Sequence, residues 1–267
     1  MELKELKKVL DIKWNNCQVV LEDNCWNKYV EFEIKPRDFL LYAKDGFKDK
    51  SNKGMINTLS NSKRAIDCQI DWILSYLGYD YLNFKESKYS EIRSVISAFE
   101  LDNDTQKDSS IKLRFIQALG IAPIFLVSRI RNLRNKLEHE YILPNEIDIK
   151  ESIEIAELFI NSTENIIFNR FITDYSIGNK YKENDWKWES SHLEVRFDTL
   201  TDKADKITIC FIDDKNNMVN KLKLKSIDNG YIYLIKASIT NDFSQIIKAF
   251  KYDFNETYVN YEVKYLI

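Results

Sequence analysis

The spacing of apolar residues changes once along this chain, and that change constrains the fold more than any other feature. Between about residues 51 and 175, apolar side chains recur at helical intervals, as in Ile66, Ile70 and Ile73. Beyond residue 180, apolar and polar residues alternate in short runs, which is typical of strands. We therefore predict an α+β protein in which an all-α bundle is followed by a β-rich domain.

Three segments follow from this pattern within the 267 residues. Residues 1–50 are a mixed N-terminal segment, residues 51–175 a helical domain and residues 180–267 a β-rich α+β domain. A chain of this length is sufficient for one large domain or two ordinary ones.

The N-terminal segment is predicted to be a small β-hairpin followed by a helix. Cys17–Glu22 and Lys28–Ile34 are strand-like, and the turn between them would lie at Asp23–Asn27. Pro36 permits a helix to begin, and Asp38–Phe47 has a helical pattern.

The remaining elements follow from periodicity and from turn residues. Further helices are expected at Ile56–Leu77, Ser90–Leu101, Ile111–Leu119, 123–140 and Ile147–Phe171. Asn179–Trp188 is interpreted as a linker or capping loop. Strands are then expected at His192–Phe197, Lys206–Ile212, Lys221–Lys225, Tyr231–Ala237 and Tyr258–Ile267, with one helix at Asp242–Phe250.

Composition limits the classes of function. The 39 basic and 42 acidic residues give a net charge of −3, so any nucleic-acid site must be a local basic patch. No apolar signal sequence or membrane span is present, and we expect a cytoplasmic protein that does not bind membranes. The four cysteines form no C-x-x-C pair and only two histidines exist, so we expect buried reduced thiols, no metal and no cofactor.

The clearest local basic patch lies in the segment 128–141, which reads SRIRNLRNKLEHEY. Four cations stand close together there without an acidic residue among them: Arg129, Arg131, Arg134 and Lys136. On a helix, one apolar stripe should face the protein's own core, formed by Leu126, Ile130, Leu133, Leu137 and Tyr141.

The same projection places polar side chains around that stripe. Arg131, Asn135 and Glu138 lie along one flank, and Arg134 lies at the edge of the stripe. His139 points almost directly away from the stripe, so its imidazole should face solvent or a partner.

These residue types suit RNA cleavage without a metal. Such cleavage needs a base for the 2′-hydroxyl proton and an acid for the departing 5′-oxygen, and histidine can serve as either near neutral pH. Arginine offers a fixed fork of donors for phosphate oxygens. One chain supplies only one suitable histidine, His139, so two copies meeting on this face would supply both groups.

The segment Arg134–Tyr141 resembles the R-N-x-x-x-H-x-Y motif of HEPN proteins, and is closest to the HEPN toxins of HEPN–nucleotidyltransferase toxin–antitoxin pairs. The resemblance covers roughly residues 55–172. It implies an all-α, dimeric, metal-independent endoribonuclease that acts as a toxin or in antiviral defence. It further implies that Arg134 and His139 are catalytic, with Asn135 supporting them, and that Tyr141 can be nucleotidylated by an antitoxin. We add Glu138 as a supporting residue and Arg129, Arg131 and Lys136 as RNA contacts.

Other interpretations stay open. The bundle could bind RNA or a protein partner without cleaving, and a basic cluster at a helix end is often only a solvated face. Glu31, Glu33 and Lys35 loosely match a metal-dependent nuclease, although exposed strand charges explain them more simply. We expect His192 to be a surface residue, and Trp186 and Trp188 to pack at a domain boundary rather than stack on bases.

Overall fold

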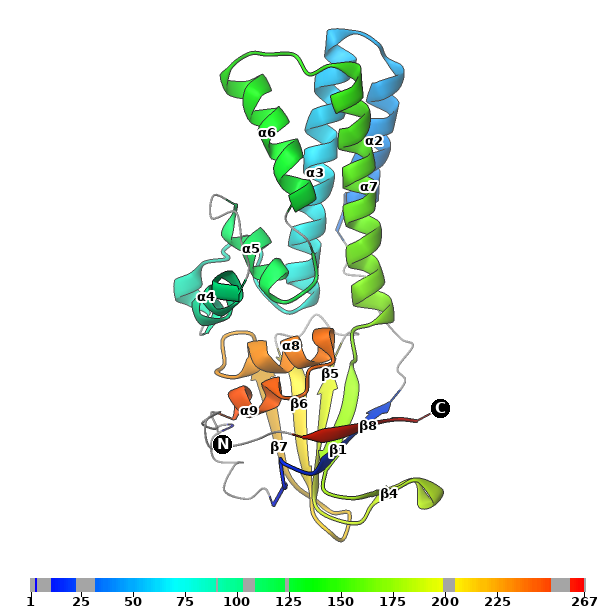
Figure 1. Cartoon of the computed structure of the whole chain (residues 1–267), viewed down its shortest axis with the longest axis vertical. Coiled ribbons are helices and arrows are strands. Elements are labelled where there is room, and N and C mark those ends of the chain that lie inside the picture. The colour runs from blue at the N-terminus through cyan, green and yellow to red at the C-terminus, as the bar shows by residue number, and fades with distance from the viewer. Residues whose placement is uncertain are drawn as a thin grey trace. The chain divides into compact units, whose positions relative to one another are not determined.

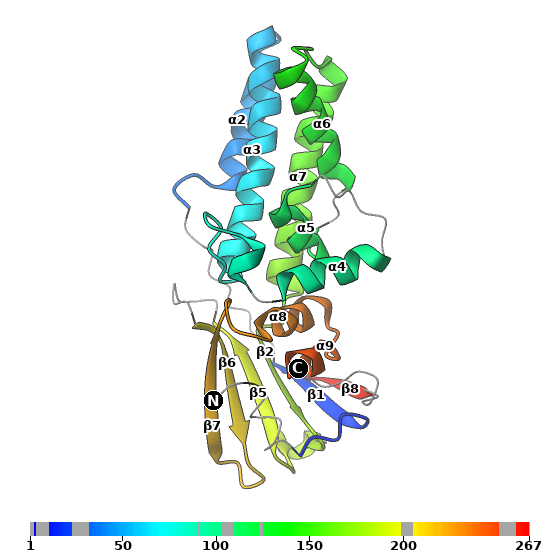
Figure 2. The same cartoon turned by 90° about the vertical axis from the view of Figure 1, so that its left-hand side faces the viewer.

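The computed structural model describes residues 3, 11–22, 32–89, 91–102, 109–122, 125–198, 205–250 and 260–266. The chain divides into two compact units, a helical unit of residues 29–84 and 94–169 and a sheet unit of residues 1–28, 85–93 and 170–267 (Figures 1 and 2). The mixed helix and strand content confirms the predicted α+β class. The segment predicted over residues 1–50 is not a unit of its own, because it is divided between the two.

The helical unit is built around four long helices that run beside one another (Figure 1). Its helices are α2 (Pro36–Lys48), α3 (Asn52–Tyr76), most of α4 (Ile92–Asp102), α5 (Ile111–Ala118), α6 (Phe125–His139) and α7 (Glu146–Asn169). α3 contacts α2, α5, α6 and α7 and is therefore the central helix of the unit. All six helices were predicted from periodicity, with ends that differ by a few residues.

Local capping explains where these helices begin. The Ser51 hydroxyl accepts a hydrogen bond from the Gly54 N–H at 3.2 Å and caps α3. The Asn145 side chain accepts from the Asp148 N–H at 2.9 Å at the start of α7. Pro36 occupies the first turn of α2, where its missing N–H costs nothing.

The interface between α3 and α7 combines an apolar core with a buried hydrogen bond between polar side chains. The largest buried side chains of the unit include Trp72, Tyr76 and Phe159. Fully buried Gln69 donates to the Thr163 hydroxyl at 2.9 Å. A polar group buried without a partner is costly, so this pair favours one register of α3 against α7.

The sheet unit holds a six-stranded sheet in the order β7-β6-β5-β2-β1-β8. Its elements are η1 (Glu86–Lys88), β1 (Cys17–Glu22), β2 (Asp174–Gly178), β3 (Tyr181–Lys182), η2 (Glu183–Asp185), β4 (Lys187–Trp188), β5 (His192–Phe197), β6 (Asp205–Ile212), β7 (Met218–Lys225), α8 (Tyr231–Thr240), α9 (Gln245–Ala249) and β8 (Tyr261–Leu266). All neighbouring pairs in this sheet are antiparallel except β1 and β8.

The predicted N-terminal hairpin is wrong. β1 lies between β2 and β8, pairing with β8 over Cys17–Glu22 and with β2 over Gln18–Glu22, so neither of its edges is open to the segment Lys28–Ile34. The described part of that segment, from Phe32 onward, is not a strand, and its other residues lie outside the described ones. The turn predicted at Asp23–Asn27 also lies outside them.

Four of the five strands predicted beyond residue 180 are present, as β5 to β8, whereas the strand predicted at Tyr231–Ala237 is helix α8. Its buried residues include Tyr231, Leu234, Ile235 and Ser238, which follow helical spacing inside a nearly continuous apolar run. Gly230, at φ +85°, makes the turn that begins this helix.

The remaining predictions in the sheet unit need smaller changes. The predicted loop over Asn179–Trp188 contains the β3–β4 hairpin, and the predicted helix over Asp242–Phe250 shortens to α9. β2 was not predicted, because its sequence DYSIG is short and contains Asp and Gly, which are uncommon in strands.

The described cysteines are free thiols. Cys17 and Cys210 are buried, and Cys68 is half-buried; Cys25 lies outside the described residues. Burial raises the pKa of the Cys17 thiol to about 11. The prediction of buried reduced thiols is confirmed for Cys17 and Cys210.

Candidate active site on helix α6

Helix α6 carries the basic segment and ends within the motif. Its last residue is His139, and the Glu140 N–H donates to the Lys136 carbonyl at 3.0 Å to close the final turn. Tyr141 follows in the left-handed region at φ +56°, an uncommon conformation for a residue other than glycine. The helix therefore stops two residues before the motif does.

The early end of α6 corrects the predicted apolar stripe. Ile130 is buried, whereas Leu133 and Leu137 are half-buried, and α6 contacts α3 and α7. Tyr141 does not belong to the stripe, because it lies beyond the helix and its side chain is 85% exposed. The side chain of Leu126 lies outside the described ones.

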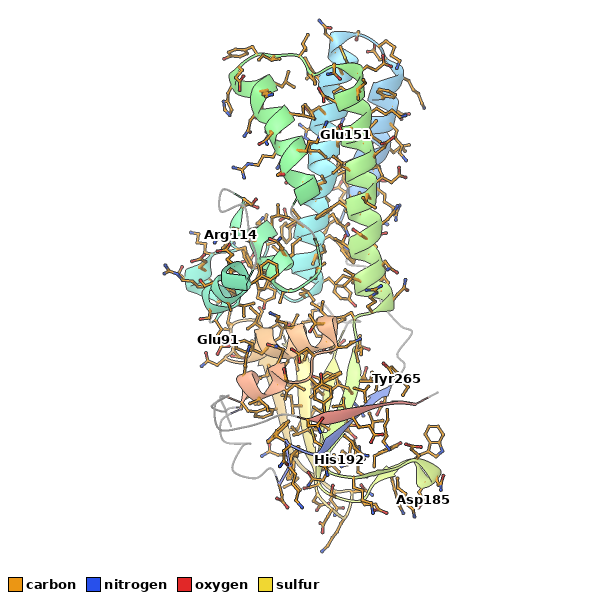
Figure 3. The ribbon with its side chains drawn as sticks, viewed as in Figure 1. Glu91, Arg114, Glu151, Asp185, His192 and Tyr265 are labelled. Atoms are coloured by element: carbon orange, nitrogen blue, oxygen red, sulfur yellow. The ribbon has the colours of Figure 1, made fainter. Side chains whose placement is uncertain are left out.

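The cations of α6 do not all point the same way. The Arg129 guanidinium lies 2.6 Å from the Glu151 carboxylate of α7, which Figure 3 labels. Arg134 pairs with Glu138 one turn later on its own helix at 2.7 Å. Lys136 is exposed. Arg129 is thus directed to α7, and Arg134 and Glu138 form one surface pair.

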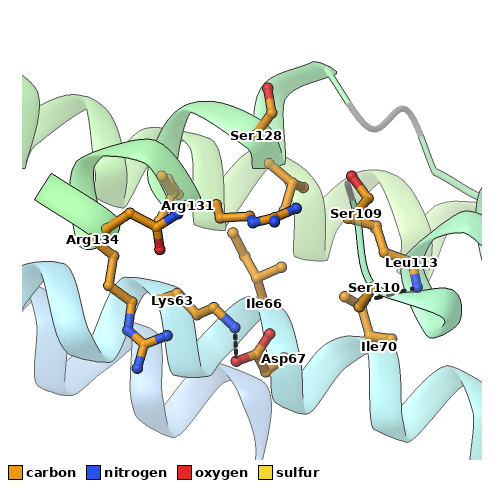
Figure 4. A pocket seen from close by; sticks show the side chains of 13 residues that line it. Lys63, Ile66, Asp67, Ile70, Ser109, Ser110, Leu113, Ser128, Arg131 and Arg134 are labelled. Carbon is orange, nitrogen blue, oxygen red and sulfur yellow. Dashed lines mark hydrogen bonds and ion pairs between the residues drawn. The ribbon is translucent and has the colours of Figure 1, made fainter. Parts of the chain in front are cut away.

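A pocket of about 360 Å³ lies beside α6 in the helical unit. Figure 4 shows Arg131 and Arg134 of α6 around it, together with Lys63 and Asp67 of α3. Its lining also includes Ser109, Ser110 and Asn135, with an apolar part formed by Ile66, Ile70, Leu113, Val127 and Ile130.

The charges of this pocket favour an anion. Among the lining residues described, three side chains are cationic and only Asp67 is acidic, and Asp67 pairs with Lys63. Ser110 is the N-cap residue of α5, so the positive end of that helix also faces this region. Arginine forks and a helix N-terminus together suit phosphate oxygens.

The structure brings together only part of the predicted site. Arg131, Arg134 and Asn135 line the pocket, whereas His139 and Tyr141 do not. His139 follows Asn135 by four residues, so the two lie on the same helix face one turn apart, and His139 is exposed at the helix end. A ligand in the pocket would have to extend one turn along α6 to reach the imidazole.

Sequence reasoning missed the α3 and α5 side of the pocket. Lys63 and Asp67 are one turn apart on α3, a common arrangement for a surface ion pair. Ser109 and Ser110 look only like a helix start in the sequence. Nothing in the local sequence links these residues to α6, because their proximity arises from the packing of three helices.

The weaker predicted constellations are placed as follows. Glu33 is exposed, Lys35 precedes α2, and Glu31 lies outside the described residues. His192, expected at the surface, is buried and stacks on Trp188 with ring centroids 5.3 Å apart. Trp188 is buried as predicted, but its ring contacts, with Tyr181 and His192, lie within the sheet unit, and Trp186 is 62% exposed.

Comparison with known proteins gives no match. No family model, no curated protein and no solved structure matches this chain. Within the described residues, no helix combines the length and the apolarity needed to cross a membrane. The functional proposal is therefore built on the residues of the site.

Proposed function

We propose that this protein is a metal-independent endoribonuclease that cleaves single-stranded RNA at helix α6. The observation that carries the proposal is an exposed histidine, His139, on a helix that also lines a cation-rich pocket. Among the described side chains of that pocket, three are cationic, Lys63, Arg131 and Arg134, and one is a carboxylate. This arrangement offers an exposed imidazole one helical turn from a place for phosphate. The HEPN-like motif at Arg134–Tyr141 supports the same reaction.

In this reaction the RNA 2′-oxygen attacks the adjacent phosphorus and the bond to the 5′-oxygen breaks. An imidazole takes the 2′-hydroxyl proton, and a second group gives a proton to the leaving 5′-oxygen. Arg134 stabilises the charge that develops on the phosphate, with Arg131 and Lys63 holding the chain nearby. Asn135 and Glu138 position these groups, and the products carry 2′,3′-cyclic phosphate and 5′-hydroxyl ends.

A second copy of the chain would complete the site. The chain's other histidine, His192, is buried and belongs to the sheet unit. The connection after α6 exposes the apolar side chains of Tyr141, Ile142 and Leu143, and Ile147 is exposed in the first turn of α7. Contiguous exposed apolar residues commonly mark a protein interface. We propose a homodimer with two-fold symmetry in which His139 and Arg134 of both copies line one cleft.

The first test is cleavage of RNA by the purified protein in the presence of EDTA. We expect cut single-stranded RNA with 2′,3′-cyclic phosphate ends, detected by end-group analysis. Cleavage that requires Mg²⁺ would contradict the proposed mechanism. RNA that is bound but stays intact under all conditions would instead support the alternative function, a HEPN-like module that binds RNA or a protein partner without cleaving.

The second test asks whether two copies share one site. Wild-type protein is mixed with an equal amount of the His139→Ala variant and allowed to exchange subunits. If both imidazoles are needed, only dimers of two wild-type copies cleave, so activity per total protein falls to about a quarter. A fall to about half would show that each copy acts alone, and a monomeric active protein would contradict the shared site.

A role as a toxin or phage-defence effector is part of the same proposal. Tyr141 is 85% exposed, so its hydroxyl is accessible to a modifying nucleotidyltransferase or antitoxin partner. Attachment of a nucleotide there would place negative charge beside His139, where the substrate phosphate should lie. Such a modification should inhibit cleavage.

A further inference from the structure

The sheet of the sheet unit has one face covered by helices and one polar face. Tyr175 of β2 contacts Phe243, between α8 and α9, with ring centroids 5.0 Å apart, so the side chains in its row face the helices. Side chains alternate along a strand, and the neighbouring row therefore faces the opposite side. That row contains Ser176 and Glu194, which are register partners across β2 and β5.

The β3–β4 hairpin lies across this polar face. The Tyr181 N–H donates to the Gln18 side chain at 2.6 Å, and the Trp188 indole N–H donates to the Ser176 hydroxyl at 3.1 Å. A Cβ added to Gly178 would lie 2.7 Å from the Trp188 ring, so glycine makes room for the ring against β2. Tyr181 and Trp188 of the hairpin are thus held in place by the sheet.

A pocket of about 300 Å³ opens between the hairpin and the sheet. Three aromatic side chains line it, from Tyr181, Trp186 and Trp188, together with the carboxylates of Glu22 and Glu194. His192 is part of the same lining. Figure 3 labels His192 and also Asp185, which lies in the turn of the hairpin. The other lining residues are Val20, Ser176, Lys187 and Asn216.

The charge around this pocket is opposite to that of the pocket beside α6. Arg196 is shared by two carboxylates, lying 3.0 Å from Glu194 and 3.7 Å from Asp174. Partial burial raises the pKa of the Glu22 carboxyl. The Arg196 guanidinium lowers this pKa, whereas the neighbouring Asp174 and Glu194 carboxylates raise it further. Lys187 is the one cation in the described lining, and it lies 3.8 Å from Asp185.

We propose that this pocket binds a small organic cation, an ammonium or guanidinium group, between its aromatic rings and the Glu22 and Glu194 carboxylates. The faces of tryptophan and tyrosine rings attract cations, and adjacent carboxylates add a direct charge interaction. This function is separate from RNA cleavage and does not depend on it.

Two other classes of ligand fit the pocket less well. A nucleotide could stack on Trp186, but Glu22 and Glu194 would repel its phosphate. A metal ion needs several ligating side chains, and within the described residues no three His, Cys, Asp or Glu side chains are grouped to hold one.

Calorimetric titration of the full-length protein with tetramethylammonium chloride and with guanidinium chloride tests the proposal, with sodium chloride at equal ionic strength as the reference. We expect saturable binding of at least one organic cation. Trp186→Leu should weaken that binding about tenfold, which corresponds to about 1.4 kcal/mol. Trp186 is exposed, so the variant should fold. Tyr265→Leu is its control, because Tyr265 is equally exposed, at 66%, and does not line the pocket (Figure 3).

A second pair of variants tests the role of charge. Glu22→Gln should weaken binding by a similar factor, whereas Glu189→Gln should not, because Glu189 pairs with Lys180 outside the pocket. The absence of saturable cation binding would overturn the proposal, as would equal affinities in the wild type, Trp186→Leu and Glu22→Gln. Tighter binding of adenosine monophosphate than of either cation, lost in Trp186→Leu, would assign the pocket to a nucleotide and overturn the proposed ligand class.

Discussion

Replacing His139 with alanine should slow RNA cleavage by about 100- to 10,000-fold, the usual contribution of a positioned general acid or base. His139 is the last residue of α6 and is exposed, so the substitution removes the imidazole without leaving a cavity. The free energy of unfolding should change by less than about 0.5 kcal/mol. Single-turnover cleavage in EDTA and thermal unfolding of the same preparation measure the two effects.

Glu140→Ala is the matched control for this variant. Glu140 is the next residue, is also exposed and lies outside the helix. Its replacement should leave cleavage nearly unchanged. If His139→Ala retains the wild-type cleavage rate, or if Glu140→Ala loses as much activity, the imidazole is not a catalytic group and the proposed function is wrong.

Arg134→Ala should reduce cleavage by about 100- to 1,000-fold, which is typical for the loss of one group that stabilises transition-state charge. The guanidinium lines the cation-rich pocket, and in the unbound protein it pairs with Glu138 at 2.7 Å. RNA binding should also weaken. The slope of log affinity against log salt concentration should become shallower by about the amount that one phosphate contact contributes. Binding isotherms at several salt concentrations measure this decrease.

Arg129→Ala provides the control on the same helix. Arg129 has the same charge, but its guanidinium faces Glu151 on α7 and does not line the pocket. Its removal should therefore affect cleavage little. Glu138→Ala should preserve or strengthen RNA binding, because it releases Arg134 from a competing carboxylate, but it should slow cleavage, because Glu138 no longer positions the guanidinium. Equal losses in Arg129→Ala and Arg134→Ala would indicate a general charge effect instead of a defined phosphate site.

The helical unit could be predicted well from the sequence because its helices bury regular apolar faces. The pattern Ile66, Ile70 and Ile73 reports local geometry directly, and all three residues are buried in α3. Strand pairing is not local in this sense. β1 finds its partners more than 150 residues away in β2 and β8, and no property of Cys17–Glu22 identifies them. Proximity in the sequence therefore favours the nearest strand-like segment, Lys28–Ile34, which is the wrong partner.

The candidate site shows the same limit. Helical projection correctly placed His139 away from the core, because that depends only on the period of one helix. It wrongly extended the stripe to Tyr141, since the sequence HEY lacks the glycine that usually marks a helix end. The other side of the pocket, Lys63 and Ser110, depends on the packing of α3 and α5 against α6. No periodicity within a single segment contains that information.

The pairing of β1 with β2 has a consequence for how the chain folds. Their register brings Glu22 opposite Asp174, so the entire helical unit is an insertion between two adjacent strands. Forming this strand pair closes a very long loop, which is slow while the loop is unstructured. Once the helical unit has folded, the loop is compact and closure costs less entropy. Core mutations in α3 or α7 should therefore slow formation of the sheet, although the mutated residues lie in the helical unit and the sheet lies in the other one.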